Sequence, residues 1–329
     1  MAKKSIFEEI TEEYPDVKLG VGAEVEEWLD TGNYSLNKVI SGDFFKGYPL
    51  GRIVELYGDP STGKSLMIYV AMANFQKKFK DHAYVILDDS EDVFTEHIAK
   101  MVGMDVNRMI LLGSETVEEH FNRLFLGMKG EEDKKVKQGL IPYILESDKE
   151  ARILLALDSV AMLSTVHEQA VLFEKDDMTK AKKIRAGIRM VNKKFVSKYG
   201  ILYLIANHTI SNIGGYGNSK STPGGKAIPF MSSVRLELNI KDKLKDKEKI
   251  IGVTSQIAAK KNKVSAPFGK TMVDILFDKG VDSMSGVADV LVEEGLLRER
   301  SGWLEDSDGI KMRRADITLD TLKKLLKHG

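Results

Sequence analysis

The segment GDPSTGKS, residues 58–65, has the residue types and spacing of a phosphate-binding loop. It satisfies the pattern G-x-x-x-x-G-K-[ST], follows a segment with strand character and opens a helical one. Backbone N–H groups at the glycine turn and the positive helix end suit phosphates, Lys64 can reach the β- and γ-phosphates of ATP, and the Ser65 hydroxyl can bind Mg²⁺. The predicted nucleotide contacts are Gly58, Asp59, Pro60, Ser61, Thr62, Gly63, Lys64, Ser65 and Leu66.

Carboxylates end two other apolar segments. In ILLALDSV, Asp158 is placed where a Walker B aspartate would hold Mg²⁺ together with Ser65. In VILDDSED, the acids are Asp88, Asp89 and Glu91, and a base that orients the attacking water is expected on such a neighbouring strand. Spacing does not decide which of the three acids serves, and an acid-rich turn that only aids solubility is the alternative.

These residues need a parallel sheet to bring them together. Short β-type segments alternate with helical patterns from residue 51 to residue 208, which predicts right-handed βαβ crossovers and an α/β fold with helices on both faces. ARILLALDSVAML, residues 151–163, reads as one buried parallel strand, and residues 178–198 read as an amphipathic helix with a basic outer face.

The later part of the chain has a different pattern. Three alternating segments, residues 232–240, 250–261 and 271–278, lack intervening helices and predict an antiparallel extension of the sheet, with KDKLKDKEK as a charged hairpin tip. A small helical module is expected to follow. The predicted organisation is an N-terminal segment at 1–32, a core at 33–280 and a C-terminal module at 281–329. The resemblance described below implies that the first is an oligomerisation segment and the second an ATPase core.

Composition narrows the class of protein. Of the 329 residues, 43% are hydrophobic and 30% charged, and no apolar segment approaches the roughly 18 residues that a membrane span needs. We therefore expect a soluble protein without a secretory signal. The absence of cysteine excludes disulfides, thiolate metal sites and cysteine nucleophiles, and it fits a cytoplasmic location.

The net charge of zero conceals an uneven distribution. From Met178 through Leu236 there are 11 lysines or arginines and no acids. This stretch includes IANHTISNIGGYGNSKSTPGGKA, residues 205–227, which follows a predicted central strand, at the sheet edge where ligands gather. The alternative interpretations are a solvated helix face for the basic residues and a mobile surface connection for the glycine loop. An acid-free segment with a glycine loop also suits a polyanion, because each phosphate contact needs a cation without a competing carboxylate.

In the order of these motifs the chain resembles the RecA and UvsX family of strand-exchange recombinases, from about Gly32 to Trp303. The resemblance is carried by GRIVELYGDPSTGKS, LDDSE, LLALDSVAML, SSVRLEL, KKNKVSAPF and GVADVLVEEGLLRERSGW. DMTKAKKIRAGIRMVNKKF and NHT are closer to the phage-type UvsX branch, which implies a phage-encoded protein. The implied fold is a RecA-like P-loop NTPase core with a mostly parallel central sheet, an antiparallel extension and small terminal appendages.

The resemblance also assigns roles to residues. It implies that Glu91 is the catalytic base, with Asp88 and Asp89 in support, and that Lys64 and His208 act on the phosphates. Lys261 and Lys263 fall where the family reaches a neighbouring subunit's ATP, although a solvated strand end is the alternative. Thr95 and Ile98 occupy the positions that frame adenine, which leaves base specificity open.

The stretch after Asn207 matches the family's second DNA-binding loop, whose glycines allow close approach to phosphates and whose aromatic residue can stack on bases. Ser164 to Asp177 matches the first DNA loop, but its acids argue against DNA contact. The predicted DNA contacts are Ser211, Asn212, Gly214, Gly215, Tyr216, Gly217, Asn218, Lys220, Gly224 and Gly225.

The function that follows is ATP-dependent strand exchange in a filament on single-stranded DNA, with duplex DNA, further copies of the chain, single-strand-binding proteins and loader proteins as partners. The N-terminal segment would dock on the next protomer, and the C-terminal module would guide duplex DNA. A mediator of the same fold, a ring-type DNA motor and a small-molecule phosphotransferase are the alternatives.

Overall fold

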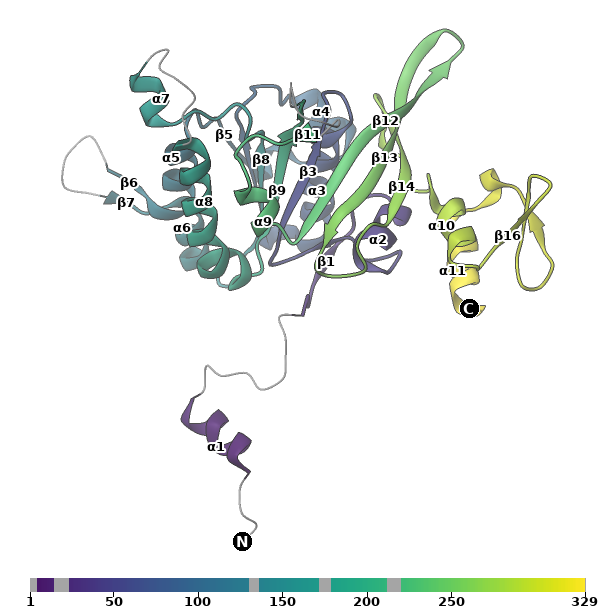
Figure 1. Cartoon of the computed structure of the whole chain (residues 1–329), viewed down its shortest axis with the longest axis horizontal. Coiled ribbons are helices and arrows are strands. Elements are labelled where there is room, and N and C mark those ends of the chain that lie inside the picture. Colours follow the sequence, from purple (N-terminus) through teal and green to yellow (C-terminus); the bar gives the residue numbers. More distant parts are fainter. Residues whose placement is uncertain (1–4, 15–23, 130–135, 172–178, 212–219, 329) are drawn as a thin grey trace.

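A nine-stranded mixed sheet forms the centre of the molecule in the computed structural model (Figure 1). The structure describes residues 5–14, 24–129, 136–171, 179–211 and 220–328. The strands lie in the order β15-β14-β13-β12-β3-β9-β8-β4-β5. The parallel part consists of β12 (Val234–Asp246), β3 (Ile53–Gly58), β9 (Leu202–His208), β8 (Arg152–Asp158), β4 (Ala83–Asp89) and β5 (Met109–Leu112). The antiparallel part consists of β13 (Lys249–Asn262), β14 (Lys270–Leu276) and β15 (Gly280–Val281).

Helices cover both faces of this sheet (Figure 1). On one face an apolar cluster packs α2 (Tyr34–Ser41), α3 (Lys64–Phe79) and α4 (Glu96–Met101) against the strands. On the other face a second cluster packs α5 (Val117–Phe121), α6 (Leu140–Ser147), α8 (Thr179–Val191) and α9 (Ala227–Met231). Because both faces are buried, the central strands are apolar almost throughout, which explains their continuous hydrophobic runs. The predicted α/β fold with an antiparallel extension is confirmed.

Two sequence-based expectations differ from the structure. Residues 151–163 do not form one strand, because β8 ends at Asp158 and the amide of Ser159 donates to the Ser90 hydroxyl instead of a neighbouring strand. The predicted helix at 178–198 is α8 followed by a π-helical segment at Asn192–Ser197. β8 ends at Asp158, and the α-helical geometry of α8 ends before Asn192. The apolar periodicity of the sequence does not mark either boundary.

The sequence predicts a helical C-terminal module, but the structure contains strands there as well as helices. It contains α10 (Val287–Glu293), α11 (Leu319–His328) and a three-stranded antiparallel sheet of β16 (Arg298–Arg300), β17 (Trp303–Glu305) and β18 (Lys311–Met312). Leu304 of β17 supplies a buried side chain to the module's core, and Phe44, which lies outside the module, joins the same cluster. The strands are too short for an alternating pattern to stand out in the sequence. The three domain boundaries remain predictions.

Short elements complete the chain. The hairpin between β12 and β13 turns at Lys247, inside the predicted charged tip, and projects beyond the body of the sheet (Figure 1). None of the residues of α1 (Ile6–Glu13) is buried. No helix among the described residues is long and apolar enough to span a membrane. The remaining strands and α-helix of the described residues are β1 (Trp28–Leu29), β2 (Tyr48–Pro49), β6 (Met128–Lys129), β7 (Val136–Lys137), α7 (Val166–Ala170), β10 (Ile210–Ser211) and β11 (Lys220–Ser221).

Candidate nucleotide and DNA site

The loop from β3 to α3 is shaped by close packing at two glycines, against backbone at Gly58 and against a side chain at Gly63. A Cβ on Gly58 would lie 2.3 Å from the carbonyl oxygen of Leu238, and a Cβ on Gly63 would lie 2.2 Å from the Ile275 side chain. Gly63 also has a φ of 97°, in the left-handed region that favours glycine. It directly precedes Lys64, so the first turn of α3 presents its N–H groups at the loop. The geometry therefore fits the phosphate-binding loop predicted for residues 58–66.

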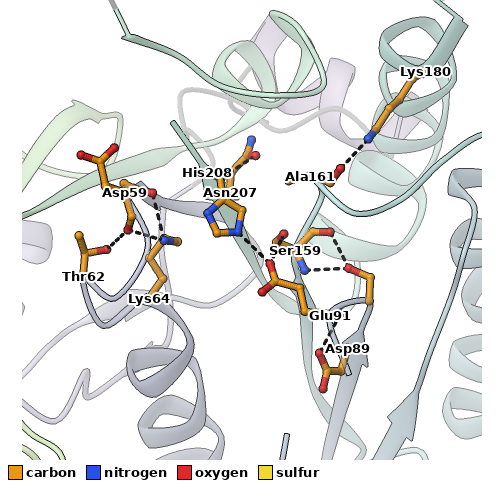
Figure 2. A network of polar contacts seen from close by, with 12 residues as sticks. Asp59, Thr62, Lys64, Asp89, Glu91, Ser159, Ala161, Lys180, Asn207 and His208 are labelled. Atoms are coloured by element: carbon orange, nitrogen blue, oxygen red, sulfur yellow. Dashed lines mark hydrogen bonds and ion pairs between the residues drawn. The ribbon is translucent and has the colours of Figure 1, made fainter. Parts of the chain in front are cut away.

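Lys64 lies at the centre of this loop. Its Nζ donates to the carbonyl oxygens of Gly58 at 3.0 Å and Asp59 at 2.9 Å, and the residue is buried (Figure 2). Burial lowers the pKa of Lys64, while the carboxylates of Asp158, Glu91 and Asp59 oppose that shift. The structure thus brings together the cation and two of the acids that the sequence predicts for one site.

Asp158 has the environment of a metal ligand. It is 2% exposed at the end of β8, and within the described part of the chain its Oδ2 has no hydrogen-bond partner. Burial raises the pKa of Asp158 to about 6, a hydrogen bond from Ser65 opposes the rise, and the charges of Glu91 and Asp89 add to it. A divalent cation would satisfy the unpartnered oxygen and relieve this cost. The described residues contain no cluster of three or more His, Asp or Glu side chains that could hold a metal ion, so bound phosphates and water would have to complete the coordination.

Glu91 and His208 contact each other directly. His208 Nε2 and Glu91 Oε1 are 2.8 Å apart, and Ser159 Oγ donates to the same carboxylate oxygen at 2.6 Å (Figure 2). Burial by itself would raise the pKa of Glu91, but the hydrogen bonds from Ser159 and His208 and the charges of His208 and Lys64 lower it below its usual range. Glu91 is therefore ionised at neutral pH and able to accept a proton.

Asp88 and Asp89 are both occupied elsewhere. Asp89 accepts the backbone N–H groups of Glu91, Val93 and Phe94, which shapes the turn after β4. Asp88 accepts from His120 Nδ1 at 2.6 Å and from the backbone N–H of Ser114. The ambiguity that spacing left among the three acids is reduced, because only Glu91 directs its side chain toward His208 and Ser159.

Two contacts near the site have no clear sequence signal. Ser159 directly follows Asp158, and its place just past a strand end is the one hint that it could contact Glu91. Thr209 donates its hydroxyl hydrogen to Asp59 of the phosphate-binding loop. Together with the Glu91–His208 contact, this bond joins the end of β9 to the nucleotide site at two points.

The predicted DNA loop begins directly after these residues. β10 and β11 pair antiparallel, with Ser211 opposite Lys220, so the loop starts from a short two-stranded stem. Gly224 and Gly225 follow with φ of 85° and 66°. Asn212, Gly214, Gly215, Tyr216, Gly217 and Asn218 lie outside the described residues. In the predicted first DNA loop, a capping box of Thr165 and Glu168 begins α7, and residues 172–177 lie outside the described residues.

Lys261 and Lys263 are not gathered at the chain's own phosphate-binding loop. Lys261 pairs with Arg235 near the start of β12, three residues before Leu238, which pairs with Gly58. Its Nζ donates to the carbonyl oxygens of Pro229 at 2.8 Å and Phe230 at 2.7 Å. Burial, Lys263 and Arg235 lower the pKa of Lys261 to about 8.

The two positions predicted to frame the adenine base lie on α4 and its N-terminal cap. Thr95 accepts the backbone N–H of Ile98 as the helix cap, and Ile98 packs partly buried against the core. Neither contact selects a base.

Comparison with known proteins gives one consistent result. The family model described as RecA N-terminal domain matches residues 10–126 and 133–282. Protein RecA of Acholeplasma laidlawii (strain PG-8A) is 28% identical over 289 residues, which cover 87% of this chain and 80% of that protein. Protein RecA of Phytoplasma mali (strain AT) is 30% identical over 289 residues, covering 84% and 75%. Protein RecA of Chlorobaculum tepidum is 28% identical over 304 residues, covering 91% and 79%.

Proposed function

Because this chain belongs to the RecA family, we propose that it is a recombinase that binds ATP and single-stranded DNA and catalyses strand exchange. The supporting observation is the direct contact between Glu91 and His208, since one residue lies beside the phosphate-binding loop and the other begins the path to the glycine loop. A contact of this kind lets nucleotide and DNA bias the same local arrangement, which is the requirement for thermodynamic coupling.

ATP hydrolysis follows from the side chains around Lys64. Lys64 and the first N–H groups of α3 bind the β- and γ-phosphates, and Ser65 and Asp158 would hold Mg²⁺, which neutralises developing charge. Glu91 accepts the proton of the attacking water, while Ser159 and His208 hold the carboxylate in place. Ser159 and His208 both contact Glu91 Oε1. We assign Oε2 to the attacking water.

The DNA site combines the glycine loop with the basic segment from α8 to β12. Phosphate and stacking contacts carry little base information, so binding is expected to be largely independent of sequence. Lys261 and Lys263 reach the ATP of the adjacent protomer, and α1 docks on that protomer, so the active site is completed only in a filament. Lys261 pairs with Arg235, three residues along β12 from Leu238, the partner of Gly58. This distance from the chain's own phosphate-binding loop supports an action between chains.

Within the RecA family, we assign the chain to the phage-type UvsX branch, acting in the cytoplasm of a host cell. It is supported by His208, which provides an imidazole where bacterial RecA has glutamine, and by the basic α8. Single-strand-binding and loader proteins are the expected partners. Strand exchange by the purified chain alone distinguishes this function from that of a mediator, which would need a second recombinase, and a filament seen by electron microscopy distinguishes it from a ring-type motor.

His208→Ala tests the coupling on which the proposal depends. The variant is expected to keep ATP binding and some DNA binding but to lose most of the stimulation of hydrolysis by single-stranded DNA, because Glu91 no longer contacts the strand that leads to the loop. Hydrolysis is measured with and without single-stranded DNA at matched salt. Stimulation equal to that of the wild type would show that His208 only fills space at the strand end.

A further inference from the structure

A row of polar side chains crosses one face of the sheet. It runs over four adjacent strands, from Asn207 on β9 through Glu55 on β3 and Arg235 on β12 to Lys261 on β13. Glu55 pairs in register with Arg235, and Arg235 pairs with Lys261. The row therefore connects the strand that leads to the glycine loop with the strand that carries the paired lysines.

Asn207 holds the two ends of the glycine loop together. Its side-chain oxygen accepts the backbone N–H of His208, at the entry to the loop. Its Nδ2 donates to the carbonyl oxygen of Pro223, just past the exit, at 3.1 Å. The same Nδ2 donates to Glu55 Oε1 at 3.1 Å. Since Asn207 is buried, these bonds do not exchange freely with water, and a shift of either end of the loop must change them.

Glu55 uses its second oxygen for Arg235. Arg235 Nε donates to Glu55 Oε2, and the Arg235 guanidinium carbon lies 4.5 Å from the centre of the Tyr57 ring. Glu55 is 0% exposed. The Arg235 side chain is 18% exposed. A largely buried ion pair is a weak source of stability compared with apolar residues of the same volume, so its presence in this sheet calls for another explanation.

The far end of the row is tied to the loop by a second route. Lys261 Nζ donates to two carbonyl oxygens of α9, the helix that begins two residues after Gly225. The positive charge of Arg235 lowers the pKa of Lys261, and the negative charge of Glu55 opposes that shift. Lys261 therefore responds to the entry of the loop through Glu55 and Arg235, and to its exit through α9.

We propose that Glu55 is a positioning residue that links the stem of the glycine loop to Lys261, so that movement of the stem on binding DNA changes the position of the lysine offered to the neighbouring protomer. The inference rests on the proposed function, because it needs the loop to bind DNA and the lysine to serve a second chain. It adds a route across the sheet to the direct contact between His208 and Glu91. Hydrogen bonds join Asn207, Glu55 and Arg235, and Arg235 reaches Lys261 through strand pairing and the repulsion between the two cations, which is a physical path for coupling rather than mere proximity.

Glu55→Gln is the first test, because it keeps the size of the side chain and removes the charge that holds Arg235. We expect stimulation of ATP hydrolysis by single-stranded DNA to fall about fivefold or more, the lower end of typical coupling between sites. Binding of a fluorescent ATP analogue should stay near wild type, since Glu55 does not touch the phosphate-binding loop. Glu237→Gln is the matched control: Glu237 is on β12, forms an ion pair with Lys260 at 3.2 Å, and is expected to leave stimulation unchanged. Wild-type stimulation in folded Glu55→Gln would overturn the inference.

A second variant decides the matter if Glu55→Gln fails to fold. Arg235→Lys keeps a positive charge opposite Glu55 and so keeps the buried pair, but it loses the planar group that stacks on Tyr57 and bonds through Nε. An intermediate loss of stimulation is expected, with thermal unfolding close to that of the wild type. Full stimulation in this folded variant would equally overturn the link.

The chemistry of Lys261 gives a readout that does not depend on hydrolysis. Removing the charge of Glu55 lowers the pKa of Lys261, so at pH 7 more of the amine is neutral and its acylation, followed by mass spectrometry in dilute nucleotide-free protein, should become severalfold faster. Lys270, exposed on β14, is the internal reference. If the wild type shows no stimulation by DNA, the proposed function fails, and this rate alone decides the link: an increase supports it, and an unchanged rate overturns it.

Discussion

The proposed nucleotide site and the surface around Lys261 differ in their surroundings, because the first gathers several charged groups of one chain and the second offers a lysine beside an exposed aromatic side chain. At the proposed nucleotide site, Lys64, Glu91, Asp158 and His208 contact groups of the same chain, and the two glycines pack closely against Leu238 and Ile275. Around Lys261, the ammonium group rests on carbonyl oxygens, and Phe230 beside it is 75% exposed. Substitutions in the first region should therefore act within each protomer, whereas substitutions in the second should act on the neighbour.

A second exposed surface is α1, none of whose residues is buried. Ile6 and Phe7 are 63% and 61% exposed, although a capping box stabilises the N-terminus of α1. An amphipathic helix with no buried residue gains little stability from its own chain and is suited to another surface. Under the proposed function, α1 and the region of Lys261 would both contact the adjacent protomer.

The largest effect is expected for Lys64→Ala. The β- and γ-phosphates lose the side-chain cation of the loop, so ATP turnover should fall below detection or by at least about a hundredfold. Turnover is measured with purified protein at saturating ATP and single-stranded DNA. Activity within about tenfold of the wild type would show that Lys64 does not bind the phosphates and that the nucleotide site is wrongly assigned.

Glu91→Gln should reduce hydrolysis by about 10² or more, the usual contribution of a general base, while ATP and DNA binding persist. Because Gln can still accept from Ser159 and His208, the site keeps its shape and the filaments on DNA become long-lived. The comparison variant is Asp89→Asn, which alters the turn but not the base. If Glu91→Gln hydrolyses normally and Asp89→Asn does not, the base is Asp89.

Lys261→Ala and Lys263→Ala test whether the second region acts between chains. When either variant is mixed with the wild type, activity should fall further than in proportion to the wild-type fraction, because each altered protomer impairs its neighbour's site. The control is a mixture of wild type with Lys270→Ala, on the adjacent strand. A strictly proportional loss would place both lysines outside any shared site and would end the contrast between the two regions.

Much of the first region could be predicted from the sequence, because its residues are grouped in short motifs. The spacing in GDPSTGKS fixes Lys64 and Ser65 on one helix start, and Asp158 falls at a strand end that apolar periodicity locates. The role of Glu55 could not be predicted, since a lone acid in a buried strand acquires meaning only from residues 152 and 180 positions away, at Asn207 and Arg235. The strands of the C-terminal module were missed because two or three residues are too few to show alternation.

The smallest expected effect on catalysis, but a clear one on stability, belongs to Asp88→Asn. Asp88 is buried with His120 and Tyr203, and it accepts from both His120 Nδ1 and the backbone N–H of Ser114. An amide has only one acceptor oxygen, so its NH₂ group would face a second donor, which costs about 1–3 kcal/mol of unfolding free energy. The rate of hydrolysis per folded molecule should stay near wild type, because the Asp88 side chain does not face Lys64.

The pH dependence of that loss gives the decisive check. Burial alone would raise the pKa of Asp88, but the hydrogen bond and charge of His120 and the bonds from Ser114 lower it below its usual range. A carboxyl whose pKa is lower in the folded chain stabilises the fold above its ordinary pKa of about 4 and loses that contribution as the pH falls toward the lowered value. The difference in unfolding free energy between wild type and Asp88→Asn should therefore be full at pH 7 and shrink below about pH 4, as followed by urea unfolding. A difference that stays constant down to pH 3, or a fall in hydrolysis per folded molecule comparable to that of Glu91→Gln, would mean that Asp88 acts in the nucleotide site rather than in the core.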